Sequence, residues 1–377
     1  MTIHELVAVF RRWLYLPDPG PVVVTLAAYV ANRLPGDPVW LLLVGPPSSG
    51  KTELLNSLSG LKDAYSVSTF TEAGLLSGST SRRPDATGGL LVELGKSGVI
   101  VCKDFGSVLS ESSETRAGIL AALREIYDGA WCRRLGTGGG LKLAWTGEAG
   151  LLAGVTETID RHAATMGALG ERFLLYRLPA LDDEGRLEQG RRAGANTGHQ
   201  VAMRHELARA VASFVGGASL LPTAEAVSSE ATEQLVLLAD LATRCRSPVE
   251  RDARDREIEL VPQPEAIGRM QAVLVQLLRG LWAIGVSDPE ARRMLGKVAL
   301  DSIPKNRRLV IEHFVSHGSN VYWATADVAD ALGIPTGVIG RTLADLAAHG
   351  IVLRHAQGGG QHRWTPSEWL LARCDEL

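Results

Sequence analysis

Short continuous apolar runs alternate with stretches of helical periodicity in the first half of the chain. Residues 39–44, 99–102 and 151–155 form such runs, with the length and composition of buried strands. Between them, apolar residues recur at the three- and four-residue spacing of an amphipathic helix, as in residues 114–127. Strands that alternate with helices indicate an α/β fold with a parallel sheet.

The pattern changes at three places, which predict four regions. Two short helices are expected before residue 38, separated by the turn-forming residues 17–21. After Pro179 the sequence becomes charged and then almost wholly helical, with interruptions at residues 221–222 and 244–255. The expected regions are an N-terminal helical segment (1–38), a core (39–180), an α-helical lid and connector (181–300) and a C-terminal domain (301–377).

Composition and charge restrict the class of protein. No apolar run approaches the roughly 20 residues that span a bilayer, and residues 1–5 lack the features of a secretory signal. We therefore expect a cytoplasmic protein without membrane contact. The net charge of −3 gives no global positive field, so contact with nucleic acid has to come from local clusters. The four cysteines form no CxxC pair, which argues against a zinc site and a disulfide framework.

The most specific motif follows the first predicted strand. Gly45-Pro46-Pro47-Ser48-Ser49-Gly50-Lys51-Thr52 fits GxxxxGK[ST], and a helix is expected directly after it. Its glycines let backbone N–H groups face phosphates, Lys51 reaches the β- and γ-phosphate oxygens, and the Thr52 hydroxyl ligates Mg²⁺. The motif predicts a site for ATP and Mg²⁺. The alternative is a chance Gly-rich turn with an exposed lysine.

A phosphate site of this kind needs an acidic residue at the end of a neighbouring strand. The second predicted strand ends in Lys103-Asp104, so Asp104 is the candidate for holding Mg²⁺ or polarising the attacking water. The usual pair at this place is Asp-Glu, and the absence of an adjacent glutamate leaves the rate of hydrolysis open. The alternative is that Asp104 only caps the next helix.

From Trp40 to Pro179 the order of motifs resembles AAA+ ATPases, and within them the minichromosome maintenance (MCM) helicases and the MCM-like ATPases of phages and mobile elements. Two apolar-alternating arms around glycine-rich residues 136–140 predict a β-hairpin. In the MCM-like group a hairpin at this place touches the DNA backbone. The resemblance therefore makes Arg133, Arg134 and Lys142 candidates for DNA contact, and the alternative is a solvated hairpin.

The resemblance also assigns residues around the γ-phosphate. Thr156 follows the third predicted strand at the sensor-1 position, and Arg172 matches the arginine finger, which acts on a neighbouring subunit. Arg269 stands where the family places its sensor-2 arginine, with Arg251 as a rival. A finger acting in trans requires an oligomer, and the resemblance implies a homo-oligomeric ring of six subunits. For each arginine the alternative is an ordinary salt bridge.

Residues 301–377 resemble a winged helix-turn-helix domain. Three helices (306–318, 325–332 and 335–349) and a hairpin with arms at 351–357 and 361–364 are expected. The side chains offered to DNA are Thr336, Arg341 and Thr342 on the third helix, and Arg354 and Arg363 on the wing. This region contains seven Lys and Arg and eight Asp and Glu, a charge balance that does not favour DNA. Docking to a protein is therefore the alternative.

His313 and His317 share a helix face at the spacing of paired metal ligands. Since no third ligand is evident, an exposed helix face is the favoured interpretation.

Two functional hypotheses follow. The first is an ATP-driven DNA translocase or helicase for the replication of a phage, plasmid or mobile element, favoured by the hairpin and Arg172. The second is an ATP-gated DNA-binding initiator, loader or regulatory protein with little hydrolysis, favoured by the Lys103-Asp104 pair. A protein remodeller would have an aromatic-hydrophobic pore loop, whereas residues 135–141 are rich in glycine.

Overall fold

The computed structural model describes residues 1–77, 88–135, 141–163, 166, 172–218, 227–252, 254, 256–318, 321–356 and 362–374. The chain divides into two compact units. The first consists of Met1–Ile159, Arg172–Ala226 and Gln276–Met294. The second consists of Asp160–Glu171, Val227–Val275 and Leu295–Leu377. None of the helices in these described ranges combines the length and apolar character needed to cross a bilayer.

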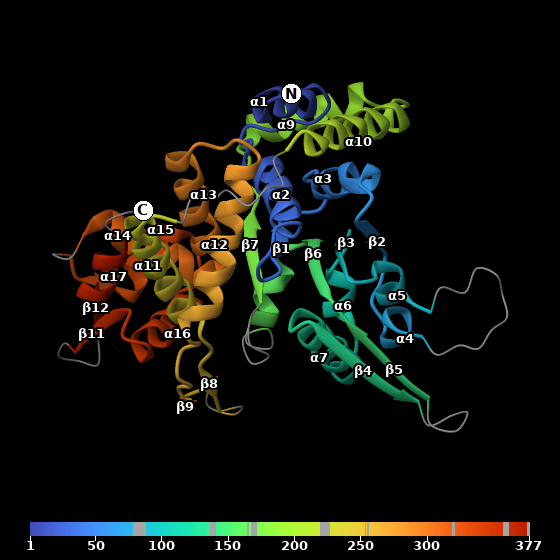
Figure 1. Ribbon diagram of the computed structural model, residues 1–377. Helices are drawn as coiled ribbons and strands as arrows, with labels where there is room; N and C mark the ends of the chain where they lie inside the picture. Colours follow the sequence, from blue (N-terminus) through green and yellow to red (C-terminus); the bar gives the residue numbers. More distant parts are fainter. Residues whose placement is uncertain are drawn as a thin grey trace. The chain divides into compact units, whose positions relative to one another are not determined.

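A five-stranded parallel sheet forms the centre of the first unit (Figure 1). Its strands are β1 (Trp40–Val44), β2 (Ala64–Val67), β3 (Ser97–Cys102), β6 (Glu148–Val155) and β7 (Phe173–Arg177). They lie in the order β2-β3-β6-β1-β7, and every neighbouring pair is parallel. The three predicted apolar runs correspond to β1, β3 and β6. The prediction of an α/β fold with a parallel sheet is therefore confirmed.

Helices surround this sheet. Those wholly within the first unit are α1 (Ile3–Trp13), α2 (Gly20–Ala31), α3 (Lys51–Asn56), α4 (Glu72–Leu75), α5 (Leu90–Leu94), α6 (Gly106–Ser110), α7 (Ser113–Tyr127), α9 (Asp183–Ala195) and α10 (Gln200–Gly216). Two 3-10 helices follow α3 and β6, namely η1 (Ser57–Gly60) and η2 (Glu157–His162). Two further helices, α12 (Ile267–Ala283) and α13 (Asp288–Asp301), have residues in both units.

Helices α2 and α7 cover opposite faces of the sheet. Side chains alternate between the two faces along a strand, and laterally paired residues share a face, so the pair Trp40↔Leu151 places Trp40 opposite to Gly150. The Trp40 ring meets the ring of Tyr127 in α7 at 5.2 Å between centroids. A Cβ on Gly150 would collide with Asn32, the residue that follows α2. The sheet is thus the middle of three layers.

Helix α10 packs against α3, η1 and α1, and it lies together with α1 and α9 (Figure 1); we call α1, α9 and α10 the cap helices. The Trp13 indole N–H donates to Glu206 on α10 at 2.8 Å, and the Asn196 amide, which follows α9, donates to the Trp13 carbonyl at 2.6 Å. These bonds join the start of the chain to helices that follow the last strand of the sheet.

The second unit contains a small three-stranded sheet and helices around a common core. Its sheet has the order β10-β12-β11, formed by β10 (Trp323–Ala324), β11 (Val352–Ala356) and β12 (His362–Pro366). Its helices and remaining hairpin are α11 (Ser229–Arg246), β8 (Glu250–Arg251), β9 (Ile258–Leu260), α14 (Lys305–His317), α15 (Thr325–Leu332), α16 (Thr336–Ala348) and α17 (Glu368–Cys374). The expected three helices and hairpin are α14, α15, α16 and β11–β12, whereas β10 and α17 were not predicted.

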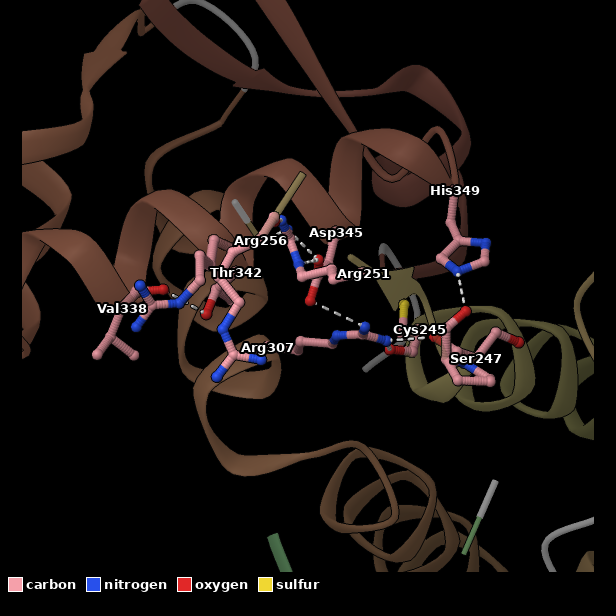
Figure 2. A network of polar contacts seen from close by, with 11 residues as sticks. Cys245, Ser247, Arg251, Arg256, Arg307, Val338, Thr342, Asp345 and His349 are labelled. Carbon is pink, nitrogen blue, oxygen red and sulfur yellow. Dashed lines mark hydrogen bonds and ion pairs between the residues drawn. The ribbon is translucent and has the colours of Figure 1, made fainter. Parts of the chain in front are cut away.

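Two arginines converge on one carboxylate of α16 in the second unit, as Figure 2 shows. Arg251 of β8 lies 2.5 Å from Asp345, and Arg307 of α14 lies 3.2 Å from it. Arg307 also donates to the carbonyls of Cys245 and Ser247 at the end of α11. The His349 ring contacts the Pro248 carbonyl, and burial lowers the pKa of this imidazole. This network fastens β8, α11 and α14 to α16.

Replacing Asp345 with Ala is expected to lower the free energy of unfolding of the second unit by about 2 kcal/mol. The reason is that two largely buried guanidinium groups lose their common acceptor. Urea unfolding followed by tryptophan fluorescence measures the change. Asp330→Ala, at an exposed position on α15, is the control. Equal midpoints for the two variants would show that the network contributes little.

Candidate functional site

The motif at residues 45–52 forms the turn between β1 and α3. Ser48 and Gly50 both have a positive φ, 63° and 90° respectively, and Gly50 is the N-cap of α3. An L side chain at Gly50 would be strained in this backbone conformation, which explains the need for glycine. The turn therefore curls tightly between the strand and the helix.

Lys51 lies at the centre of this loop and is only 8% exposed. Its ammonium donates to the carbonyls of Gly45 at 2.8 Å and Pro46 at 2.7 Å, and to the Ser49 hydroxyl at 3.0 Å. Burial lowers the pKa of this lysine, and the nearby Asp104 carboxylate acts in the opposite direction. The loop thus encloses a fixed cationic group.

Asp104 and Thr156 leave the sheet at the same edge as the loop. The register pairs Val44 with Val155 and Cys102 with Ala153, and β6 lies between β1 and β3. The residues that follow these three strands therefore emerge side by side. One Asp104 oxygen accepts from the Gly106 N–H at 2.9 Å, but the N-cap residue of α6 is Phe105, so Asp104 is not the cap that the alternative interpretation proposed.

The Thr156 hydroxyl forms a hydrogen bond with the Thr158 hydroxyl at 2.7 Å. A threonine hydroxyl both donates and accepts, so Thr156 can still turn toward a water molecule or a phosphate oxygen. The residue after it, Glu157, is exposed.

A cavity of about 320 Å³ opens between the loop and the cap helices. The loop side is formed by residues 48–53. The opposite side consists of the end of α1 and of residues on or near α9 and α10, namely Trp13, Leu14, Tyr15, Leu16, Gln189, Arg192, Ala193, Asn196, Gln200 and Met203. It therefore presents an apolar wall together with several amide groups.

A second cavity of about 450 Å³ lies on the other side of the loop. The two cavities share Tyr15, Leu16, Ser49 and Gln189, so they adjoin each other along the loop, and we call the two together the groove. Pro46, Pro47, Glu157 and Arg186 line the second cavity. Sequence reasoning missed the groove residues outside the motif, because only the packing of α1, α9 and α10 brings them to the loop.

Arg172, the predicted arginine finger, is buried in its own unit. Its side chain is 7% exposed and pairs with both oxygens of Asp128 at 3.0 and 2.8 Å. Its guanidinium also lies 5.3 Å from the centroid of the Tyr127 ring. In this structure Arg172 therefore makes the salt bridge that was the alternative to the finger.

Arg269 and Arg251, the two sensor-2 candidates, belong to the second unit. Arg269 is exposed on α12 and lies 3.2 Å from Glu265 of the same unit. Arg251 is held by Asp345. Both arginines therefore belong to a different unit from the loop.

The predicted hairpin is present as β4 (Ala130–Leu135) and β5 (Leu141–Thr146), and its tip, residues 136–140, lies outside the described residues. Arg133 pairs with Glu72 and donates to the Leu76 carbonyl, which ties the hairpin to α4. Arg134 and Lys142 are exposed and stand directly opposite each other. Two like charges in facing positions repel each other.

The C-terminal candidates lie in different environments. Thr336 and Arg341 are exposed on α16, whereas Thr342 is 7% exposed and donates to the Val338 carbonyl, so the assignment of Thr342 to a groove-reading face is wrong. On β11, the Arg354 guanidinium lies 5.9 Å from the centroid of the Trp364 ring of β12. Arg363 donates to the Tyr322 carbonyl at 2.9 Å.

The His313 and His317 rings lie 4.5 Å apart, and the ring of Trp323 packs against both. In the part of the chain that the structure describes, no group of three potential metal ligands is found. The histidine pair thus belongs to an aromatic cluster.

No family model matches the chain, and no curated protein matches it either. Two solved structures of the C-terminal region of NrS-1, a phage protein, are weakly similar. Both are apo structures of the A form and are 12% identical to this chain. The matches cover 97% of this chain and 75% and 74% of theirs, with TM-scores of 0.23 and 0.25.

Proposed function

We propose that this chain is an AAA+ ATPase that uses ATP to move along or unwind DNA, in the replication of a phage, plasmid or mobile element. The observation that carries the proposal is the convergence of the Lys51 loop, Asp104 and Thr156 at one sheet edge, beside a groove of ligand size. A cavity of about 320 Å³ lies within the range of small-molecule sites. A homo-oligomeric ring of six is the assembly that the resemblance to MCM-like ATPases implies.

In the proposed binding mode, the triphosphate of ATP lies in the loop and the sugar and base lie in the cavity. The loop supplies the cation and the curled backbone for the triphosphate, and the cavity that starts at residues 48–53 takes the sugar and base. The apolar wall that includes Tyr15 and Met203 suits a flat ring, and amides such as Gln200 suit its polar edge. The nucleotide would therefore lie between the loop and the cap helices.

The Thr52 hydroxyl and the Asp104 carboxylate are hard oxygen donors of the kind that Mg²⁺ prefers. Their positions at the start of α3 and just beyond the end of β3 fit that ion, which when bound neutralises charge on the β- and γ-phosphates. Lys51 supplies a further positive charge on the loop side. The site then stabilises the charge that develops as the γ-phosphoryl group leaves.

Glu157 supplies the carboxylate that is missing after Asp104. It directly follows Thr156, and it lines the groove with Pro46 and Pro47. A carboxylate here can orient a water molecule for attack on the γ-phosphate, and Thr156 can hold that water. This observation favours hydrolysis over the ATP-gated alternative, in which the nucleotide only switches assembly.

Contact with DNA is assigned to the hairpin. The facing cations Arg134 and Lys142 are exposed near its tip and suit a phosphate backbone. The C-terminal domain offers Arg341 to DNA as a winged helix, with docking to a protein as its alternative role. Movement of the hairpin during the ATP cycle would transfer energy to the strand.

Lys51→Ala is expected to abolish ATP binding, because the loop loses its enclosed cation. Glu157→Gln is expected to keep ATP affinity and lose roughly a hundredfold or more in turnover. Titration with a fluorescent ATP analogue and steady-state phosphate release measure the two effects, with Lys62→Ala as the control at an exposed site. Full affinity in Lys51→Ala would refute the phosphate site. Negligible turnover by the unmodified protein, with tight ATP binding, would favour the ATP-gated switch.

Arg172→Ala and Asp128→Ala are expected to differ if Arg172 acts on a neighbouring subunit. The finger role requires the guanidinium to leave Asp128, so Arg172→Ala should lose about a thousandfold in DNA-stimulated turnover while Asp128→Ala retains it. Steady-state hydrolysis with single-stranded and duplex DNA gives the comparison, and urea midpoints show how far each variant is destabilised. A parallel loss of stability and turnover in both variants would assign Arg172 to structure alone.

The double variant Arg134→Ala/Lys142→Ala is expected to weaken DNA binding and to flatten its salt dependence. Loss of two phosphate contacts lowers the slope of log affinity against log salt by about 1.4 for single strands. Fluorescence anisotropy at several salt concentrations measures it. Lys62→Ala/Lys96→Ala removes two exposed cations elsewhere and should leave the slope unchanged. An unchanged slope in the hairpin variant would exclude the hairpin from the DNA interface.

A further inference from the structure

Glu53 is the first residue after the motif, and its carboxylate is an unexpected group beside a site for triphosphate. It lines the cavity between the loop and the cap helices. Its side chain is 18% exposed, so water reaches it only in part. A negative charge this close to an anion site repels the ligand unless a cation cancels it.

Arg204 of α10 provides that cation. Its guanidinium donates to both oxygens of Glu53, with N···O distances of 3.2, 2.9 and 2.6 Å. This pairing lowers the pKa of Glu53, so the carboxyl group stays ionised. Arg204 itself does not line the cavity, so it approaches the carboxylate from outside.

The pairing leaves Glu53 as a fixed acceptor inside the cavity. An ionised carboxylate accepts at about four lone-pair sites. Two N–H groups of Arg204 and the side chain of Asn56 donate to Glu53, which leaves about one of these sites for a further donor. A bidentate guanidinium also restricts the rotamer of the side chain. The free acceptor capacity is thus positioned next to Thr52.

The order of groups in a nucleotide determines what meets this acceptor. With the triphosphate in the loop at residues 45–52 and the base against Tyr15 and Met203, the sugar lies between them. Glu53 stands at this intermediate place, because it follows the loop directly and faces the same cavity. The polar groups that a sugar presents there are hydroxyls, which donate to a carboxylate.

We infer that the site selects ribonucleotides, and that Glu53, neutralised and held by Arg204, accepts a hydrogen bond from a ribose hydroxyl. This inference rests on the proposed function, since it assumes that the loop binds a nucleoside triphosphate. A site built to pair a hydroxyl rejects the analogue that lacks it, because a largely buried acceptor is then left without its partner. Arg204 has the separate role of making the carboxylate compatible with the phosphates.

The test compares the affinities of ATP, 2′-deoxy-ATP and 3′-deoxy-ATP for the full-length protein. The unmodified protein should bind ATP roughly tenfold or more tightly than the analogue that lacks the contacted hydroxyl. In Glu53→Ala the three affinities should become nearly equal. In Arg204→Ala all three should weaken in parallel with their ratio preserved, because the uncompensated carboxylate repels every triphosphate.

Glu125→Ala, an exposed glutamate on α7 outside the cavity, is the matched control and should keep the unmodified ratio. Circular dichroism and urea midpoints establish that the variants fold. Equal affinities in the unmodified protein, or an unchanged ratio in Glu53→Ala, would overturn the inference. The Glu53–Arg204 salt bridge would then serve only to join α3 to α10. Absence of binding of all three nucleotides, with no effect of Lys51→Ala, would instead overturn the proposed function itself.

Discussion

Parallel, in-register pairing of β1 with β6 and of β6 with β3 determines where the candidate chemistry is found. The pairs Val44↔Val155 and Ala153↔Cys102 make three strands end almost level. The loop that holds Lys51, the carboxylate of Asp104 and the hydroxyl of Thr156 therefore emerge at one edge, although they are far apart in sequence. A slip of one residue in either pairing would turn the alternating side chains of a strand to the other face. The buried faces of this sheet, with Trp40 on one and Gly150 on the other, oppose such a slip.

Sequence patterns predicted those parts of the fold and site that depend on local order. The apolar runs predicted β1, β3 and β6, and the GxxxxGK[ST] spacing marked the tight turn at Gly50. The short elements β10 and α17 gave too few residues for a periodic pattern. The residues that line the groove could not be predicted for another reason. Residues such as Asn196 and Gln200 belong to no motif, and only tertiary packing brings them near the loop. Thr342 was misassigned because its helix turns it toward the core, where its hydroxyl bonds to the preceding turn.

The cap helices couple the beginning of the chain to the loop. Glu206 of α10 accepts a hydrogen bond from the Trp13 indole N–H. Arg204, two residues earlier in the same helix, forms a salt bridge with Glu53, the first residue after the motif. Helix α10 thus contacts α1 through Glu206 and α3 through Arg204. Both walls of the cavity are therefore set by contacts between segments that are distant in sequence. Substitutions in α1 would alter the groove without touching the loop.

The burial of α2 has a consequence for the order in which the protein is made. Every residue of this helix is buried, and its partners include β1, β6 and α3. A further partner is Gly280 of α12, where a Cβ would collide with the Ala27 carbonyl oxygen, so the two backbones touch. During synthesis α2 leaves the ribosome about 250 residues before Gly280 does, counting from residue 31 to residue 280. Over that interval the partners β1, α3 and β6 can already cover part of α2, but the side that touches Gly280 stays open until most of the chain has been translated.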